Sequence, residues 1–221
     1  MALAKVLIAV KTYPAISAKY DELVCTAGFR EDGTWIRLFP VPYRKLDYSS
    51  QYKKYDWIEL DLVKNTSDFR PESYRPRSID GEVKVIGHIS TKDNWRERKE
   101  IVLKNVYTNL GKLKMDAKNR NIKTSLAVFK PAVINKFSWK EVDRKWNKEK
   151  LSQLAQGNLF EKKGTQYEVV RKLPYKFSYT VVDDEGTEST MMIEDWEIGA
   201  LYWNLFGKYN GDEARTCANV E

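Results

Sequence analysis

Residues 22–42 read ELVCTAGFREDGTWIRLFPVP, and this stretch decides the first part of the fold. Two apolar runs flank Glu31-Asp32-Gly33, and an Asp-Gly pair readily takes the positive φ values of a tight hairpin turn. In the returning run Trp35, Arg37 and Phe39 alternate with isoleucine and leucine, so the two sets lie on opposite faces of a strand. The stretch therefore predicts a β-hairpin with one apolar face and one aromatic and basic face.

The same alternation of apolar and polar residues recurs on both sides of this hairpin. Further strands are predicted at Lys5–Val10, Trp57–Lys64, Glu82–Ile89, Ser125–Phe129, Ala132–Trp139, Tyr167–Val170, Tyr175–Val182 and Thr187–Ile193. Helical periodicity predicts helices at residues 95–119 (in two pieces divided near Asn105), 141–156 and 195–209. Strands, then a helical insert, then more strands and a helix predict a β-rich α+β fold.

Two segments lack a clear period. Residues 65–80 contain Pro71 and Pro76 among arginines and serines, which predicts a flexible loop. Residues 211–221 are small and polar. We expect this tail to lie loosely on the surface, unless the chain stops before a natural domain boundary.

Length and composition bound the class of protein. Of 221 residues, 42% are apolar and 31% charged, so we expect a folded chain of one domain or two small domains. No apolar run approaches the roughly 18–20 residues that span a membrane, and no signal peptide precedes the first strand. A cytoplasmic location without membrane contact is expected. Cys25 and Cys217 are too few for a disulfide scaffold or a four-cysteine zinc site.

Catalytic signatures are missing from the sequence. It has one histidine, no phosphate-binding glycine loop and no dinucleotide fingerprint, so no catalytic residue, metal ligand or cofactor is assigned. Asp56, Glu59 and Asp61 with Lys64 are the nearest approach to the carboxylate cluster of a metal-dependent nuclease. Their spacing does not fit the usual nuclease pattern, and a solvated strand face is the simpler interpretation.

The net charge of +7 is unevenly spread. Residues 84–150 carry 18 basic and 7 acidic side chains, whereas residues 151–221 carry 7 basic and 12 acidic ones. A local basic excess favours polyanions, and arginines beside aromatic rings are typical of surfaces that hold phosphates and stack bases. The candidate nucleic-acid-binding residues are Trp35, Arg37, Phe39, Arg44, Lys53, Lys54, Arg70, Tyr74, Arg75, Arg77, Arg96, Arg98, Lys112, Lys118 and Arg120. Core packing is the alternative for the two aromatic residues of the hairpin, and solvated surface for the basic ones.

Several runs resemble one family of uncharacterised prokaryotic proteins. They are Glu22–Gly28, Asp32–Pro42, Lys54–Leu60, Ser125–Pro131, Lys172–Tyr179 and Asp195–Trp203. The chain is similar over nearly its whole length to the dual OB-containing domain family, which is linked to defence or mobile-element loci. The resemblance implies two small OB-like β-barrel modules with helical insertions, at residues 1–121 and 122–221, and one compact unit is the alternative. It carries no catalytic residues, and the insert at about 91–121 leaves open whether the first barrel's face is accessible.

These observations favour a non-catalytic module that binds single-stranded DNA or RNA. A scaffold or adaptor subunit of a larger complex is the first alternative, because an acidic, aromatic final third follows a basic middle. A metal-dependent nuclease is the second alternative.

Overall fold

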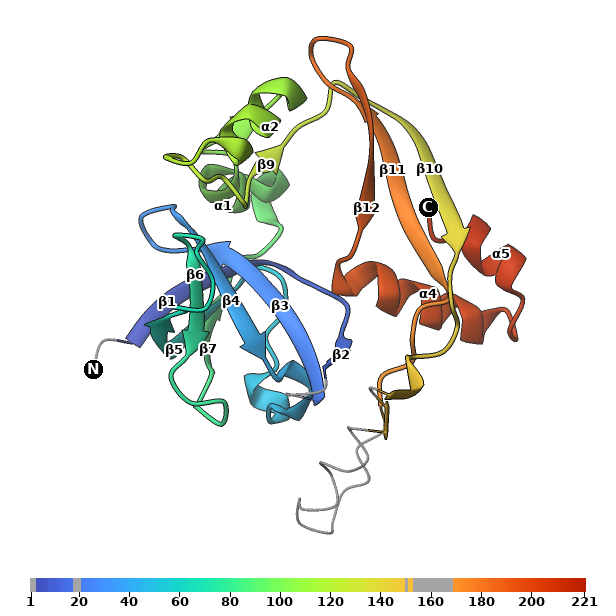
Figure 1. Cartoon of the computed structure of the whole chain (residues 1–221), viewed down its shortest axis with the longest axis horizontal. Helices are drawn as coiled ribbons and strands as arrows, with labels where there is room; N and C mark the ends of the chain where they lie inside the picture. Colours follow the sequence, from blue (N-terminus) through green and yellow to red (C-terminus); the bar gives the residue numbers. More distant parts are fainter. Residues whose placement is uncertain (1–2, 18–20, 150, 153–168) are drawn as a thin grey trace.

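The computed structural model describes residues 3–17, 21–149, 151–152 and 169–221, and shows a barrel beside a smaller sheet (Figure 1). The strands and short 3-10 helices of the first part are β1 (Leu3–Lys11), β2 (Ala15–Ser17), β3 (Asp21–Phe29), β4 (Trp35–Val41), η1 (Tyr43–Lys45), η2 (Tyr48–Ser50), β5 (Asp56–Lys64), β6 (Ser73–Pro76) and β7 (Lys84–His88). The following elements are α1 (Lys92–Val102), β8 (Val106–Tyr107), α2 (Leu110–Lys118), β9 (Val128–Phe129), β10 (Val133–Glu141), β11 (Tyr175–Val182), β12 (Glu188–Ile193), α4 (Trp196–Lys208) and α5 (Glu213–Ala218). The chain is therefore α+β and rich in strands, as predicted.

Five strands close into a mixed barrel in the order β1-β3-β4-β6-β5, and β5 pairs back onto β1. The β4–β6 pair is parallel, and the other pairs are antiparallel. Alternate side chains of each strand point inwards, so Val6, Ile8, Ile36, Leu38 and Ile58 are fully buried in the barrel core. The prediction for the first hairpin is confirmed, and Gly33 takes the positive φ of its turn.

The strand β6 lies inside the segment predicted to be a flexible loop, so that prediction is wrong for residues 73–76. Ser73 and Tyr74 pair in parallel with β4. Tyr74, Arg75 and Pro76 pair antiparallel with β5. A strand this short has no readable period of its own, because its extended conformation comes from two neighbours that are distant in sequence.

The helical insert covers part of the outer surface of the barrel. It is divided near Asn105 as predicted, into α1 and α2 with the short β8 between them. Ile101 and Val128, from the insert and from β9, pack on an apolar cluster that contains Leu7 and Phe29 of the barrel. Burying these outward-facing side chains fixes the insert on one end of the barrel.

The second part is an open three-stranded antiparallel sheet in the order β10-β11-β12. Phe137 and Phe177 of the sheet are buried against Tyr202 of α4 and Cys217 of α5. The expectation of a second OB-like barrel is wrong, because the sheets of this part do not close. The tail is not loose either, since α5 packs into this core.

The two parts meet where the end of β1 contacts α4. The Tyr13 hydroxyl accepts a hydrogen bond from Trp203 Nε1 at 2.9 Å and donates one to the Arg171 carbonyl at 2.9 Å. Gly199 of α4 lies against the Tyr13 ring, because a Cβ at this position would come within 2.0 Å of it. The close approach therefore needs glycine.

Some predictions fall wholly or partly outside the described residues. Residues 150 and 153–156 of the predicted helix at 141–156, and residues 167–168 of the predicted strand at 167–170, lie there. Of the described residues in these segments, 148–149 and 151–152 are helical, whereas 142–147 are not, and 169–170 form no strand. Among the described residues, no helix is both long and apolar enough to cross a membrane.

Candidate nucleic-acid interface

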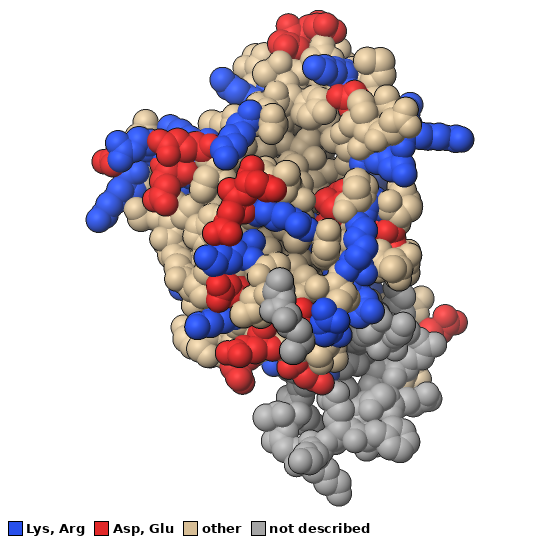
Figure 2. Space-filling model, turned by 90° about the vertical axis from the view of Figure 1, so that its left-hand side faces the viewer, with Lys and Arg blue, Asp and Glu red and all other residues tan. Residues whose placement is uncertain are grey.

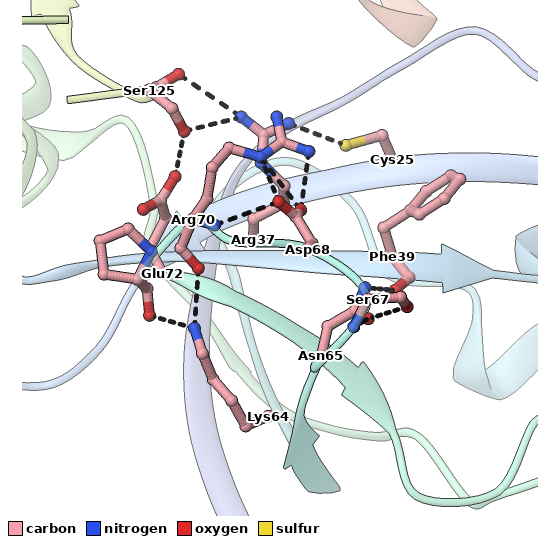
Figure 3. A network of polar contacts seen from close by, with 11 residues as sticks. Cys25, Arg37, Phe39, Lys64, Asn65, Ser67, Asp68, Arg70, Glu72 and Ser125 are labelled. Carbon is pink, nitrogen blue, oxygen red and sulfur yellow. Dashed lines mark hydrogen bonds and ion pairs between the residues drawn. The ribbon is translucent and has the colours of Figure 1, made fainter. Parts of the chain in front are cut away.

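The outer face of β3 and β4 presents Cys25, Arg37 and Phe39 side by side (Figure 3). Phe39 keeps 38% of its surface exposed, whereas the isoleucine and leucine that alternate with these residues are fully buried. Strand alternation thus places a thiol, a guanidinium and an aromatic ring on one accessible face.

Arg37 is only loosely held on this face. Its Nη1 lies 3.4 Å from Cys25 Sγ, and its Nη2 lies 3.4 Å from both oxygens of Ser125 (Figure 3). The contacts to Ser125 are long for hydrogen bonds, and the Ser125 hydroxyl also bonds Glu72. Arg37 Nε is buried and has no hydrogen-bond partner in the described part of the chain. The long Nη2 contacts to Ser125 are therefore the ones that a stronger acceptor could replace.

The loop between β5 and β6 borders this face and is well tied. Arg70 forms a two-pronged ion pair with Asp68 at 2.7–3.0 Å. The hydrogen bonds from Arg70 hold the pKa of the Asp68 carboxyl well below its usual range. Lys64 Nζ donates to the carbonyls of Arg70 and Pro71 at 2.8 and 2.5 Å (Figure 3). Arg70 is thus committed to its own loop.

A pocket of about 610 Å³ opens where the β3–β4 face meets the second part of the chain. Its barrel side is formed by Cys25, Phe39 and four residues that follow β1, namely Thr12, Tyr13, Ala15 and Ile16. The other side comes from Trp146, Tyr175 and Met192 with two lysines, Lys172 and Lys176. Its volume is within the range of small-ligand sites, which are apolar clefts with a few polar groups.

The other end of the β3–β4 face carries an aromatic pair that packs on the insert. The Trp35 ring lies 4.1 Å from the Phe29 ring, centroid to centroid, and both belong to the apolar cluster that the insert covers. Core packing therefore accounts for Trp35. The insert leaves the Phe39 end of the face accessible.

Many of the candidate basic residues are engaged within the chain. Ion pairs join Arg44 to Glu22, Lys54 to Asp195 and Glu197, Arg77 to Asp61, and Arg96 to Asp93. Arg98 is buried, donates to the Ile89 carbonyl and stacks on Tyr55 at 4.0 Å. These arginines stabilise the fold, and a ligand phosphate would have to compete with their present partners.

The remaining candidates are dispersed. Tyr74 packs on the barrel core beneath Arg30, whose guanidinium carbon lies 4.5 Å from its ring centroid. The exposed ones lie on three parts of the chain: Lys53 before β5, Arg75 on β6, and Lys112, Lys118 and Arg120 on or just after α2. Figure 2 shows that basic and acidic side chains are interspersed on the left-hand side of the view in Figure 1. That side offers no continuous basic track.

The carboxylates considered for a nuclease do not gather into a metal site. Asp56 is buried, and its Oδ1 lies 2.6 Å from His88 Nδ1. His88 Nε2 lies 3.3 Å from an arginine nitrogen of Arg98, so the imidazole bridges two structural partners. Asp61 pairs with Arg77. Within the described ranges, no cluster of three histidines, cysteines or carboxylates could hold a metal ion.

Sequence reasoning missed Cys25, Lys172 and Lys176 as pocket residues. The sequence does contain a partial signal for Cys25, because residues two apart on a strand share a face and Cys25 is two residues from Leu23. Both residues line the pocket. The two lysines flank the start of a predicted strand, but only the packing of the two parts brings them opposite Phe39.

Two family models match the chain. One, described as a domain of unknown function (DUF8758), matches residues 2–104. The other, described as a domain of unknown function (DUF8757), matches residues 107–221. No curated protein and no solved structure matches the chain. The two models meet close to the division between the barrel with α1 and the part that follows.

Proposed function

We propose that this chain, which belongs to the DUF8757 family, binds a single strand of DNA or RNA at the Phe39 end of its β3–β4 face. The observation that carries the proposal is the pocket of about 610 Å³ between this face and Lys172 and Lys176. The pocket joins an exposed aromatic ring to cationic groups, which is the combination that single-strand binding uses.

The strand order of the barrel supports an OB-like fold. Numbered within the barrel, β1, β3, β4, β5 and β6 are its first to fifth strands, so the order is first-second-third-fifth-fourth. The third and fifth strands pair in parallel, as OB barrels require. OB barrels bind oligonucleotides on the face of the second and third strands, between the first-second and fourth-fifth loops.

The pocket occupies the corresponding position in this chain. Leu23 and Cys25 come from the second barrel strand and Phe39 from the third, and the first-second connection supplies Thr12, Tyr13, Ala15 and Ile16. Residues 65–72 form the fourth-fifth loop and border Arg37 (Figure 3). A base stacked on Phe39 would leave its phosphates within the field of the two lysines.

Direct titration tests this proposal. Labelled single-stranded DNA and RNA are titrated with the protein at low and moderate salt, and anisotropy is measured. Stacking on one aromatic ring is worth about 1–3 kcal/mol, so Phe39→Ala should weaken binding roughly 5- to 150-fold.

The matched control is Tyr48→Ala. Tyr48 lies on η2, is 91% exposed and does not line the pocket, so its loss should leave affinity unchanged. Equal affinities for wild type and Phe39→Ala, or no binding of either nucleic acid at low salt, would refute the proposal.

A further inference from the structure

The register of β10 and β11 brings lysines and hydroxyl residues onto one face of the second sheet. Lys140 lies directly opposite Lys176, Ser138 opposite Ser178, and Lys136 opposite Thr180. Directly opposite residues of an antiparallel pair project to the same side of the sheet. We call this set of six residues the lysine face.

The lysine face is the side of the sheet that the helices leave uncovered. The alternating residues Phe137 and Phe177 point to the other side, where they are buried with α4 and α5. Lys136, Lys140 and Lys176 are all exposed. Every side chain of the lysine face can donate a hydrogen bond, and none carries a negative charge.

None of the three lysines forms an ion pair with a described residue. Of the acidic residues nearby, Glu141 pairs with Arg144, Glu188 keeps its charge and accepts a hydrogen bond from Asn135, and Glu194 follows β12 and lines the pocket with Lys176. Like charges directly opposite each other, such as Lys140 and Lys176, destabilise a sheet. An anionic ligand would relieve that repulsion.

The lysine face continues from the pocket. Lys176 belongs to both, and Met192, which is opposite Ser178 on β12, also lines the pocket. From Lys140 to Lys136 the face extends for about 13 Å along β10, at roughly 3.3 Å per residue. A nucleic-acid strand that leaves the pocket along this sheet would therefore meet the further lysines of the lysine face, Lys140 and Lys136.

We propose that the lysine face binds the phosphates of the same nucleic-acid strand whose base occupies the pocket, an inference that rests on the proposed function. The contacts are to the backbone, so they add affinity and salt dependence without sequence preference.

The experiment compares two triple variants of the full chain. The first is Lys136→Gln with Lys140→Gln and Lys176→Gln. The second is the control Lys84→Gln with Lys92→Gln and Lys99→Gln, which removes equal charge from exposed positions on β7 and α1. Affinity for one labelled single strand is measured across a salt series, and circular dichroism checks that both variants are folded.

The slope of log K against log salt is negative, and the lysine-face variant should make it shallower by about 2, because each phosphate contact of a single strand contributes about −0.7. The control should leave the slope unchanged. An unaltered slope in the lysine-face variant, while Phe39→Ala still weakens binding, overturns this inference and spares the proposed function.

Two other outcomes also overturn the inference. If wild type binds neither DNA nor RNA, the proposed function fails and the inference fails with it. If wild type binds polyglutamate through these lysines and binds no oligonucleotide, the face belongs to an acidic protein partner instead.

Discussion

Replacing Lys11 with methionine should remove the rise in the free energy of unfolding that this residue causes at alkaline pH. Lys11 ends β1, is only 4% exposed and lies where the barrel meets α4. Its Nζ donates to the Tyr43 hydroxyl at 2.7 Å and to the Tyr52 carbonyl at 2.9 Å. The same Nζ lies 4.8 Å from the centroid of the Trp196 ring. A buried ammonium thus sits among aromatic rings from both parts of the chain.

The magnitude follows from two pKa values. Burial lowers the pKa of Lys11 from 10.5 to about 8, although Glu197 and Asp56 attract the charged form and Lys53 and Lys54 repel it. The unfolded chain therefore binds this proton more tightly, so stability is lowest below about pH 8 and rises toward pH 10.5. At about 1.4 kcal/mol per pKa unit, the gain between about pH 7 and about pH 9.5 is about 2 kcal/mol.

Urea unfolding followed by tryptophan fluorescence measures this difference at both pH values. Lys11→Met retains the hydrogen bond from Tyr43 to the Tyr52 carbonyl, so we expect it to fold and to lose the alkaline gain of about 2 kcal/mol. Lys92→Met, at an exposed position, should keep the wild-type pH dependence. If wild type and Lys11→Met gain or lose the same stability between the two pH values, the assignment of a buried, charged Lys11 is wrong.

Two further substitutions separate structural residues from binding residues. Gly199→Ala places a Cβ within 2.0 Å of the Tyr13 ring and should destabilise the chain by roughly 1–3 kcal/mol. Gly207→Ala, in the same helix with open space around it, should be neutral or stabilising by up to about 1 kcal/mol. Thermal unfolding compares the two variants, and equal changes in melting temperature would contradict the contact between Gly199 and Tyr13. Arg98→Met removes two hydrogen bonds to the Ile89 carbonyl and should lower the free energy of unfolding by roughly 1–3 kcal/mol. Its oligonucleotide affinity should stay at the wild-type value. Weaker oligonucleotide binding by the folded variant would show that Arg98 contributes to the binding site.

Local signals in the sequence were sufficient for the hairpins and for α4. The turn at Gly33 and the turn at Gly186 both use the positive φ that their glycines permit. Asp195 caps α4 by accepting a hydrogen bond from the Ile198 amide at 3.0 Å. In each case the residues that determine the structure lie within a few positions of one another, so a short window of sequence contains the whole cause.

Closure of the sheets could not be predicted in the same way. The barrel closes only because β6 inserts between β4 and β5, whereas the composition of β6 predicts a loop. The second part has equally clear strands, yet its sheet of β10 to β12 stays open with α4 and α5 on one side. Both outcomes depend on which distant segments pair, and the alternation of a single strand contains no information about its partner.

For the candidate site, the sequence predicts which side chains face outward but not which partners they have. Strand alternation placed Arg37 and Phe39 outward, and the structure agrees. It could not show that Arg44 pairs with Glu22, or that Arg77 pairs with Asp61, because each acid lies on another strand. A count of arginines therefore overestimates the charge that is available to a ligand.

The lysine face shows why segment charges are a poor guide to a binding surface. Lys136 and Lys140 lie in the basic middle region, but Lys176 lies in the final third, where acidic residues exceed basic ones. Sheet register joins them across that boundary. Conversely, basic residues of the middle region such as Arg96 and Arg144 are neutralised by nearby carboxylates. The field that a polyanion would meet depends on which charges share a face and lack partners. The register of β10 and β11 therefore locates the proposed phosphate contacts more sharply than the net charge of either segment does.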